Sequence, residues 1–254
     1  MKKDSDQAPP AFSQEDFGFE RVSQEDKTRK VQEVFSSVSL RYDLMNDLMS
    51  LGLHRMWKRF AIDLCRLGPN DRVLDLAGGT GDLTRLIAKK VSKNNVIIAD
   101  ANNEMLTQGR SRLLDLGLNV QVVQCDGVSI PFASNTFDCV TVGFGIRNMT
   151  QKETALAEIN RVLKWGGRAI ILEFSDVWEP MKKIYDAYSF SFLPYLGGKI
   201  VKDVASYRYL AESIKMHPSQ KSFKKIMELS GFSFVEFYNL TMGVVAVHKG
   251  IKCE

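Results

Sequence analysis

The sequence has few of the residues that build metal sites or disulfide scaffolds. It contains three histidines and four cysteines in 254 residues, and no two cysteines form a C-x-x-C pair. None of the histidines is at metal-ligand spacing from another histidine or from a cysteine. The sequence therefore predicts neither a zinc site nor a disulfide framework.

Long hydrophobic runs are also missing. No uncharged apolar run approaches the ~18 residues that a membrane-spanning helix needs. Residues 1–20 are polar and acidic and lack the apolar stretch of a secretory signal, so we expect a cytoplasmic protein. The net charge is only +4 and the basic residues are dispersed, which argues against nucleic acid as a partner but permits weak attraction to an anionic surface.

What the sequence does contain is an ordinary globular composition, with 44% hydrophobic and 25% charged residues. We expect a flexible arm at 1–25 and one domain at 26–254. Within that domain, helices over 26–66 are predicted to form a lid. One of them carries Val31, Phe35, Val38 and Tyr42 on a single apolar face.

From residue 72, short apolar runs alternate with helical patterns, at 73–77, 95–100, 120–125, 137–144 and 168–174. This rhythm predicts a parallel sheet covered by helices on both faces. An aromatic-rich stretch at 175–219 interrupts it as a helical insertion on the substrate side. Two final runs, FSFVEFY and GVVAVHKG, predict an antiparallel hairpin. The predicted fold is therefore a doubly wound α/β domain with a seven-stranded, mostly parallel sheet.

The most informative segment is the glycine turn at 78–81. An apolar strand runs into Gly78, Gly79, Thr80 and Gly81 and then into a helix, an arrangement that lets a ligand approach main-chain N–H groups. The dinucleotide fingerprint G-x-G-x-x-G fails because its third glycine is replaced by Thr84. Asp75 and Asp82 flank the turn, which favours a cationic, phosphate-free ligand such as S-adenosylmethionine over a pyrophosphate.

Two further acidic residues follow the next two strands. Asp100 is placed to accept both ribose hydroxyls of an adenosine, and Asp126 to accept the adenine amino group, with Gly127 leaving room for the ring. Taken singly, each is more typical of an ordinary turn. Together with the glycine turn they indicate a nucleoside cofactor site at the carboxyl edge of the sheet, and a methyltransferase rather than a dehydrogenase.

The loop at 143–148 distinguishes among methyltransferases. It reads Gly143-Phe-Gly-Ile-Arg-Asn148 and lacks the Asn/Asp-Pro-Pro-aromatic tetrad typical of enzymes that methylate exocyclic or amide amines. Arg147 and Asn148 are expected beside the reactive centre instead.

At this level of detail the chain resembles the ubiquinone/menaquinone biosynthesis C-methyltransferase family over about residues 17–250. The specific blocks are YDLMNDLMS at 42–50, FGIRN at 144–148 and YRYLAESI at 207–214. The resemblance implies methyl transfer from S-adenosylmethionine to a ring carbon of demethylmenaquinol, of 2-methoxy-6-polyprenyl-1,4-benzoquinol, or of both. Asp126, where some relatives have Asn, and Trp165, which replaces a Pro, depart from the family pattern. Family cofactor contacts correspond to Thr80, Asp100, Asp126, Gly127 and Gly143.

Three residues are candidates for catalysis. Arg147 would stabilise the developing quinol oxyanion or order a water, because a guanidinium stays protonated; the alternative is a surface arginine paired with a carboxylate. Asn148 would orient the quinol or cap the next helix. Tyr42 is either core or part of a lid over the acceptor. His217 and His248 are expected to be structural.

A polyprenyl tail sets further expectations. The candidates for an apolar tail channel, each of which taken singly is more typical of ordinary core, are Met45, Met49, Phe190, Phe192 and Leu193. We expect peripheral membrane contact through the N-terminal helices or the insertion, helped by Lys58, Arg59, Lys182 and Lys183. A homodimer or a quinone-synthesis complex stays open. So do another lipid acceptor and a non-catalytic cofactor-binding subunit, whereas an RNA methyltransferase is disfavoured.

Overall fold

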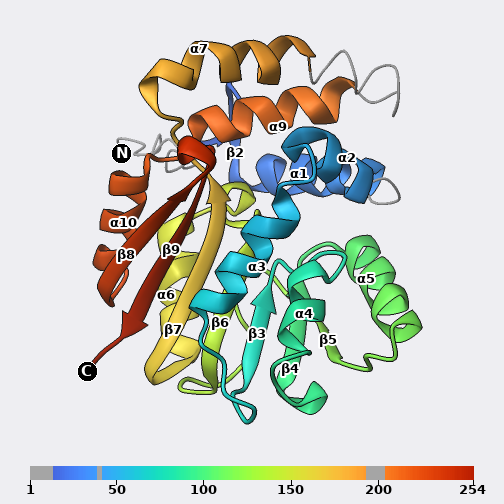
Figure 1. The fold of residues 1–254 in the computed structure, drawn as a ribbon, viewed down its shortest axis with the longest axis vertical. Helices are drawn as coiled ribbons and strands as arrows, with labels where there is room; N and C mark the ends of the chain where they lie inside the picture. The colour runs from blue at the N-terminus through green and yellow to red at the C-terminus, as the bar shows by residue number, and fades with distance from the viewer. Residues whose placement is uncertain (1–13, 39–41, 193–203) are drawn as a thin grey trace, which may run out of the picture.

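The computed structural model describes residues 14–38, 42–192 and 204–254. A seven-stranded sheet in the order β5-β4-β3-β6-β7-β9-β8 forms its centre (Figure 1). The first five strands in that order are mutually parallel, and β9 is antiparallel to both of its neighbours. The predicted doubly wound fold with a terminal hairpin is confirmed. The strands are β3 (Val73–Leu76), β4 (Val96–Asp100), β5 (Gln121–Gln124), β6 (Phe137–Gly143), β7 (Leu163–Phe174), β8 (Phe232–Leu240) and β9 (Val245–Lys252).

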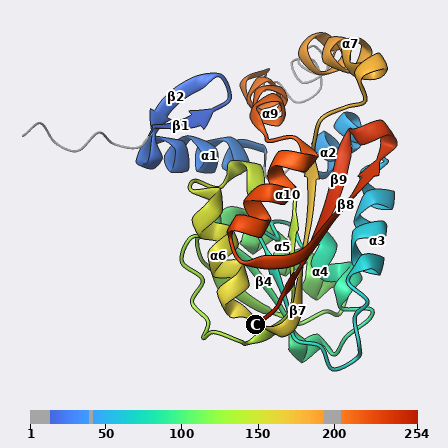
Figure 2. The same cartoon turned by 90° about the vertical axis from the view of Figure 1, so that its left-hand side faces the viewer.

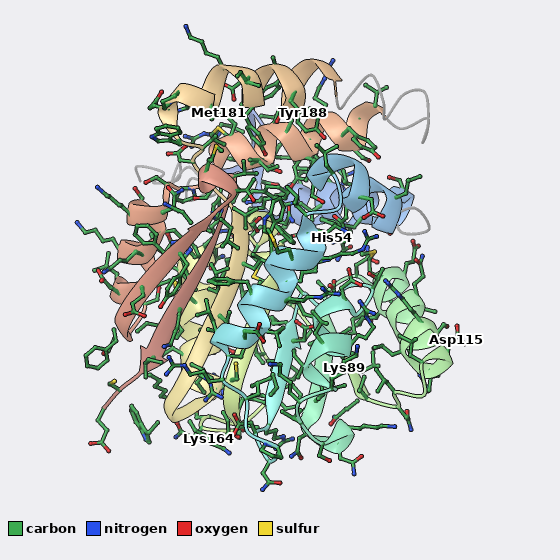
Figure 3. The ribbon with its side chains drawn as sticks, viewed as in Figure 1. His54, Lys89, Asp115, Lys164, Met181 and Tyr188 are labelled. Atoms are coloured by element: carbon green, nitrogen blue, oxygen red, sulfur yellow. The ribbon has the colours of Figure 1, made fainter. Side chains whose placement is uncertain are left out.

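The strands are buried because their side chains pack alternately on both faces of the sheet. Val73 and Ile98 face a core formed with α3, α4 and α5, whereas Leu74 and Ile97 face α6 and α10. Figure 3 shows how densely side chains fill both layers. The helices are α3 (His54–Leu64), α4 (Asp82–Ile87), α5 (Asn103–Asp115), α6 (Lys152–Val162) and α10 (Gln220–Leu229).

A second group of elements covers the carboxyl edge of the sheet (Figure 2). It comprises a two-stranded hairpin of β1 (Gln14–Phe17) and β2 (Glu20–Ser23), helices α1 (Gln24–Val38), α2 (Tyr42–Ser50), α7 (Glu179–Ala187) and α9 (Val204–Met216), and a π-helical turn at Tyr188–Phe192. The predicted helical character of the insertion agrees with α7 and α9. In the part of the chain that the structure describes, no helix has the length and apolar character needed to cross a membrane.

Two expectations about the N-terminal region are wrong. Residues 14–25, expected to belong to a loose arm, form the β1–β2 hairpin and the first turn of α1, because Ser23 accepts a hydrogen bond from the Asp26 N–H and caps the helix. Tyr42 does not continue the helix that carries Val31 and Phe35; it begins the separate helix α2.

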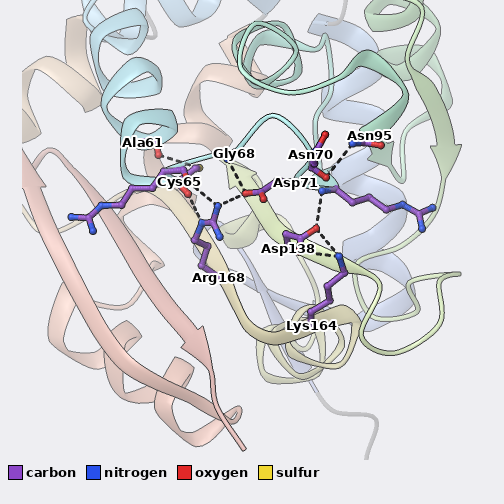
Figure 4. A network of polar contacts seen from close by, with 11 residues as sticks. Ala61, Cys65, Gly68, Asn70, Asp71, Asn95, Asp138, Lys164 and Arg168 are labelled. Atoms are coloured by element: carbon purple, nitrogen blue, oxygen red, sulfur yellow. Dashed lines mark hydrogen bonds and ion pairs between the residues drawn. The ribbon is translucent and has the colours of Figure 1, made fainter.

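Polar contacts close the opposite, amino edge of the sheet (Figure 4). The Arg168 guanidinium on β7 donates to the Cys65 and Arg66 carbonyls at the end of α3 and to Asp71. Lys164 and the Arg72 N–H both donate to Asp138, at 2.8 Å to Oδ2. These contacts fasten α3 and the loop before β3 to β6 and β7, far from the carboxyl edge.

Candidate functional site

A pocket of about 810 Å³, its open mouth included, lies over the carboxyl ends of β3, β4, β5 and β6 and beneath α1. Parallel α/β sheets bind ligands at this edge because the loops that leave the strands converge there. Its lining includes Gly79, Asp100, Asn102, Asp126, Gly127, Gly143 and Asn148 from the sheet side, and Gln32 and Phe35 from α1.

The glycine turn forms one wall of this pocket. Gly79 and Gly81 have φ of 53° and 82°, the left-handed region that glycine adopts without strain. A Cβ on Gly78 would lie 2.6 Å from Ile98 Cγ1, and one on Gly109 would lie 2.5 Å from the Gly79 carbonyl oxygen. The glycines therefore let α5 and β4 pack directly against the turn. Gly81 is not among the described residues that line this pocket; it provides the left-handed N-cap of α4.

Asp100 ends β4 with its carboxylate held by main-chain groups. Oδ2 accepts the Gly79 N–H and Oδ1 accepts the Asn102 N–H, both at 2.9 Å. Burial raises the pKa of this carboxyl. Each oxygen has a second lone pair for a hydroxyl donor, so the predicted ribose contact is stereochemically available.

Asp126 and Gly127 line the same pocket beyond the end of β5. The Asp126 carboxylate accepts the Val128 N–H at 3.2 Å and so closes an Asx turn. A Cβ on Gly127 would lie 2.8 Å from Met149 Sδ, so this glycine makes room for Met149, which itself lines the pocket.

A smaller pocket adjoins the first and shares Gly79 and Gly143 with it. Asp75, Gly78 and Thr80 line it. Asp75 is completely buried and accepts the Thr84 hydroxyl at 2.6 Å and the Thr141 hydroxyl at 2.8 Å. Burial raises the pKa of Asp75 to about 6 despite these hydrogen bonds. Asp75 thus supports the floor of the glycine turn.

Asp82, the other acid that flanks the turn, is already paired. It accepts Lys58 Nζ at 2.6 Å and lies 3.2 Å from Arg112 Nη2. Its charge is therefore balanced within the protein, and it does not present a free carboxylate to a cationic ligand. Lys58 is buried beside Asp82, and the membrane contact expected of it stays a prediction.

The Arg147 side chain is buried and lines neither pocket. Its Nη1 donates to the Phe144 carbonyl at 2.7 Å and to Glu173 Oε1 at 2.8 Å, while Glu173 Oε2 accepts the Arg147 N–H at 3.3 Å. The arginine is paired with a carboxylate, but in the interior rather than at the surface. It holds the 144–148 loop in shape. Sequence reasoning missed Glu173; its signal was a lone acid at the end of the apolar run RAIILEF.

Asn148 does line the large pocket. Its Oδ1 accepts the Tyr209 hydroxyl at 2.9 Å, and its Nδ2 is buried with no hydrogen-bond partner among the described residues. Burial raises the pKa of Tyr209 to about 12, so the hydroxyl stays protonated and acts as donor. The Tyr209 ring stacks on Phe17 at a centroid distance of 4.2 Å. Tyr209 is the insertion residue that contacts the site, and the sequence did not distinguish it from Tyr207.

The other predicted residues contribute less. Met45 and Met49 are buried in the core, and Phe190 is half-exposed. The Tyr42 and Phe192 side chains and all of Leu193 lie outside the described residues. Burial lowers the pKa of His217 to about 3 and of His248 to about 4, which agrees with structural roles for neutral imidazoles. No group of three metal-ligating side chains occurs within the described ranges.

The sheet order and the pocket at its carboxyl edge define a Rossmann-like fold of the kind found in methyltransferases. A SAM-dependent methyltransferase from Thermotoga maritima matches with a TM-score of 0.60 at 19% identity, over 87% of this chain and 99% of that one. Phosphoethanolamine N-methyltransferase 2 from Haemonchus contortus, solved with S-adenosyl-L-methionine, gives a TM-score of 0.54 at 16% identity, over 74% of this chain and 50% of that one. At such identities the likeness extends to the fold alone.

The sequence relationship is closer. The model of the ubiE/COQ5 methyltransferase family matches residues 22–252. The ubiquinone/menaquinone biosynthesis C-methyltransferase UbiE of Nitrosospira multiformis is 54% identical over 237 residues, which are 93% of this chain and 97% of that protein. The chain therefore belongs to the ubiE/COQ5 methyltransferase family and is a C-methyltransferase, as the resemblance predicted.

Proposed function

We propose that this protein transfers the methyl group of S-adenosylmethionine to a ring carbon of a polyprenylated quinol in respiratory quinone biosynthesis. The acceptor is demethylmenaquinol, a methoxy-polyprenyl-benzoquinol, or both. Family membership supports the reaction, and the quinone-biosynthesis activity of a 54% identical relative supports the acceptor class. The observation that carries the proposal is the fixed, unpartnered Asn148 amide beside the cofactor pocket.

The pockets fit the cofactor. Asp100 offers two oxygens for ribose hydroxyls, and Asp126, which lines the same pocket, offers an acceptor for an adenine amino group. The shared wall at Gly79 and Gly143 leads to the smaller pocket, which we assign to the amino-acid portion. When bound, S-adenosylmethionine supplies a methyl group activated by a sulfonium. The chain's own residues orient it and shield it from water beneath α1.

The acceptor side depends on hydrogen bonding to an oxygen. A ring carbon is a poor nucleophile unless the neighbouring quinol oxygen donates electrons into the ring, and the carbon that gains the methyl group must release its proton. Buried donors without a partner are rare, so Nδ2 of Asn148 is suited to bind that oxygen as its negative charge develops. The Tyr209 hydroxyl fixes the amide so that Nδ2, and not Oδ1, is available.

In this proposal Arg147 does not contact the acceptor; it holds the loop that carries Asn148 in position. Because Glu173 balances its charge, the pair stabilises the 144–148 loop rather than presenting an isolated cation. The guanidinium remains protonated and does not act as a base. Removal of either partner would leave a buried charge unpaired and displace Asn148.

The acceptor experiment uses methyl-labelled S-adenosylmethionine with a short-tailed methoxy-benzoquinol and a demethylated naphthoquinol, both chemically reduced. Label on a ring carbon is the expected result, and the ratio of products assigns the preferred acceptor. Tyr209→Phe, which removes only the hydroxyl, should lower kcat about fivefold while cofactor affinity stays unchanged, since one hydrogen bond of roughly 1 kcal/mol orients the amide. Unlabelled acceptors in the presence of bound cofactor would contradict the proposal and favour another lipid acceptor or a non-catalytic subunit.

The cofactor experiment is separate. Asp100→Asn keeps the size of the side chain but places an amide against main-chain N–H groups, so S-adenosylmethionine should bind about 10–100-fold more weakly by titration calorimetry. Asp115→Asn, at the far end of α5, is the matched control and should leave affinity unchanged. Equal affinity of Asp100→Asn and the wild type would refute the assigned ribose contact.

A further inference from the structure

A cationic pocket lies beside the cofactor site, between the first turns of α3 and the helices α4 and α5. Its space, open mouth included, is about 460 Å³. Five of its lining side chains carry a positive charge and only one carries a negative charge. Its lining comprises His54, Arg55, Lys58, Arg59, Asp82, Arg85, Leu86 and Arg112.

Among the residues that the structure describes, the ion pairs of these cations involve two carboxylates, Asp82 and Asp47. Asp82 is shared by two of the cations, and Arg55 donates to Asp47 at 2.7 Å. Among the ion pairs of the described residues in this region, none involves Arg59 or Arg85, and the Arg85 Nε is buried without a hydrogen-bond partner. Uncompensated arginine groups that share one concavity are the arrangement that binds phosphate.

The imidazole of His54 adds a buried donor group to the same wall. His54 is 5% exposed; its Nε2 lies 2.9 Å from Asp47 Oδ1, and its Nδ1 has no partner among the described residues (Figure 3). An unsatisfied buried nitrogen calls for a ligand or for water.

The placement of these cations opposes the helix dipole. The first turn of α3 contains no acid, and four of its first six residues, HRMWKR, are basic or histidine. Positive charge at a helix N-terminus destabilises the helix, and an anion held among these side chains would offset that cost. With its basic first turns, α3 should therefore be more stable when an anion is bound beside them than when none is bound.

Exposed apolar side chains lie next in sequence to the basic residues of this pocket, on the turn that joins α2 to α3 and in the first turn of α3. Leu51 is 76% exposed and Met56 is 54% exposed, and Leu53 between them is 38% exposed. A free phosphate ion gains nothing from such neighbours. Apolar side chains projecting beside a cluster of cations are the combination that binds an acidic membrane surface, because the former enter the acyl boundary while the latter hold headgroup phosphates.

We propose that the cationic pocket binds the phosphate of an acidic phospholipid headgroup, with Leu51 and Met56 inserted into the membrane surface beside it. The membrane contact is then made at the α2–α3 turn rather than at α7. Because the cationic pocket shares Lys58 and Asp82 with the smaller cofactor pocket, docking there brings the active site to the bilayer. The membrane location of a polyprenyl acceptor rests on the proposed function, whereas lipid binding itself does not.

The test is flotation of the full-length protein with vesicles of phosphatidylcholine alone and of phosphatidylcholine mixed with phosphatidylglycerol. Wild-type protein should float with the acidic vesicles only. Arg59→Gln/Arg85→Gln should bind them about thirtyfold more weakly, given the usual contribution of each basic residue near an acidic leaflet. Lys182→Gln/Lys183→Gln, on α7, is the control that matches the loss of charge and should float like the wild type.

Further experiments distinguish binding of a lipid headgroup from binding of free phosphate, and membrane docking from catalysis. The double variant Leu51→Ser/Met56→Ser should lose vesicle binding. Its His54 ring resonances, followed by NMR, should still shift on addition of inorganic phosphate as they do in the wild type. All variants should methylate a short-tailed acceptor at the wild-type rate in the absence of vesicles. If the wild type itself does not methylate that acceptor, the proposed function is wrong, whereas flotation still tests the docking site. Binding of inorganic phosphate without flotation, flotation with neutral vesicles, or loss of binding in the α7 control would overturn the proposal.

Discussion

At the scale of single residues, Asp75 makes a measurable prediction about pH. Its carboxyl is completely buried, and burial raises its pKa from 3.8 to about 6 in the folded protein. The folded state therefore binds the proton more tightly than the unfolded state. The resulting stabilisation is fully present below about pH 4 and is lost as the pH rises through about 6, with a total of roughly 3 kcal/mol.

The measurement is the free energy of urea unfolding of wild type and Asp75→Asn between pH 4 and 7. The difference between the two proteins should shift in favour of the variant as the pH rises, by about 3 kcal/mol in all. Asp138→Asn is a control of opposite sign: burial alone would raise the pKa of Asp138, but the hydrogen bond from Lys164 lowers it, so its stabilisation is lost as the pH falls. A pH-independent difference for Asp75→Asn would refute the assignment.

The same scale shows what a sequence can and cannot reveal about the site. Asp100 was predictable because the end of a parallel strand fixes where its side chain points. The contacts between Glu173 and Arg147 and between Tyr209 and Asn148 join residues 26 and 61 positions apart. No local pattern encodes such pairs: the first depends on the pairing of β7 with β6, and the second on how the insertion folds back over the sheet.

At the scale of elements, α1 and the β1–β2 hairpin cover the cofactor pocket and are fastened to its rim. Lys27 Nζ donates to Glu15 Oε2 at 3.1 Å and to the Met149 carbonyl at 3.4 Å, and Asn102 Nδ2 donates to the Gln32 carbonyl and to Ser36. The polar composition of the first 25 residues concealed this role. From sequence alone, short edge strands and a charged helix cannot be distinguished from a flexible arm, because the contacts that hold them in place are long-range.

Lys27→Met should therefore loosen the lid. Lys27 is 1% exposed, so its loss leaves Glu15 without its buried partner, and we expect S-adenosylmethionine to dissociate about tenfold faster while α1 exchanges its amide hydrogens faster. Stopped-flow displacement and hydrogen exchange measure the two effects. Lys30→Met in the same helix removes a more exposed ion pair with Glu20 and should change neither. Unchanged dissociation from Lys27→Met would show that α1 does not retain the cofactor.

At the scale of the whole molecule, the two edges of the sheet have different roles: the carboxyl edge carries the functional groups, and the amino edge carries contacts that stabilise the fold. The carboxyl edge carries the cofactor pockets, a strained Phe144 with φ of 58°, and unpartnered polar groups. The amino edge carries paired groups, with Arg168 and Asp71 in contact and Lys164 bound to Asp138 (Figure 4). Backbone strain and hydrogen-bond donors without a partner are tolerated at a site where a bound ligand can pair with the donors. The contacts at the amino edge offset the free-energy cost of both.

Arg168→Ala tests this division. It removes contacts with Asp71 and with the Cys65 and Arg66 carbonyls at the end of α3, so unfolding by urea should become easier by about 2 kcal/mol. The affinity for S-adenosylmethionine, measured by calorimetry well below the unfolding temperature, should stay at the wild-type value, since α3 contributes only Lys58 to the smaller cofactor pocket. Lys182→Ala, which breaks an exposed pair with Glu179, should change stability by less than about 0.5 kcal/mol. If Arg168→Ala weakened cofactor binding as much as it weakened the fold, the two edges would be coupled through the strands, and the carboxyl edge could not be treated as a site built on an independent scaffold.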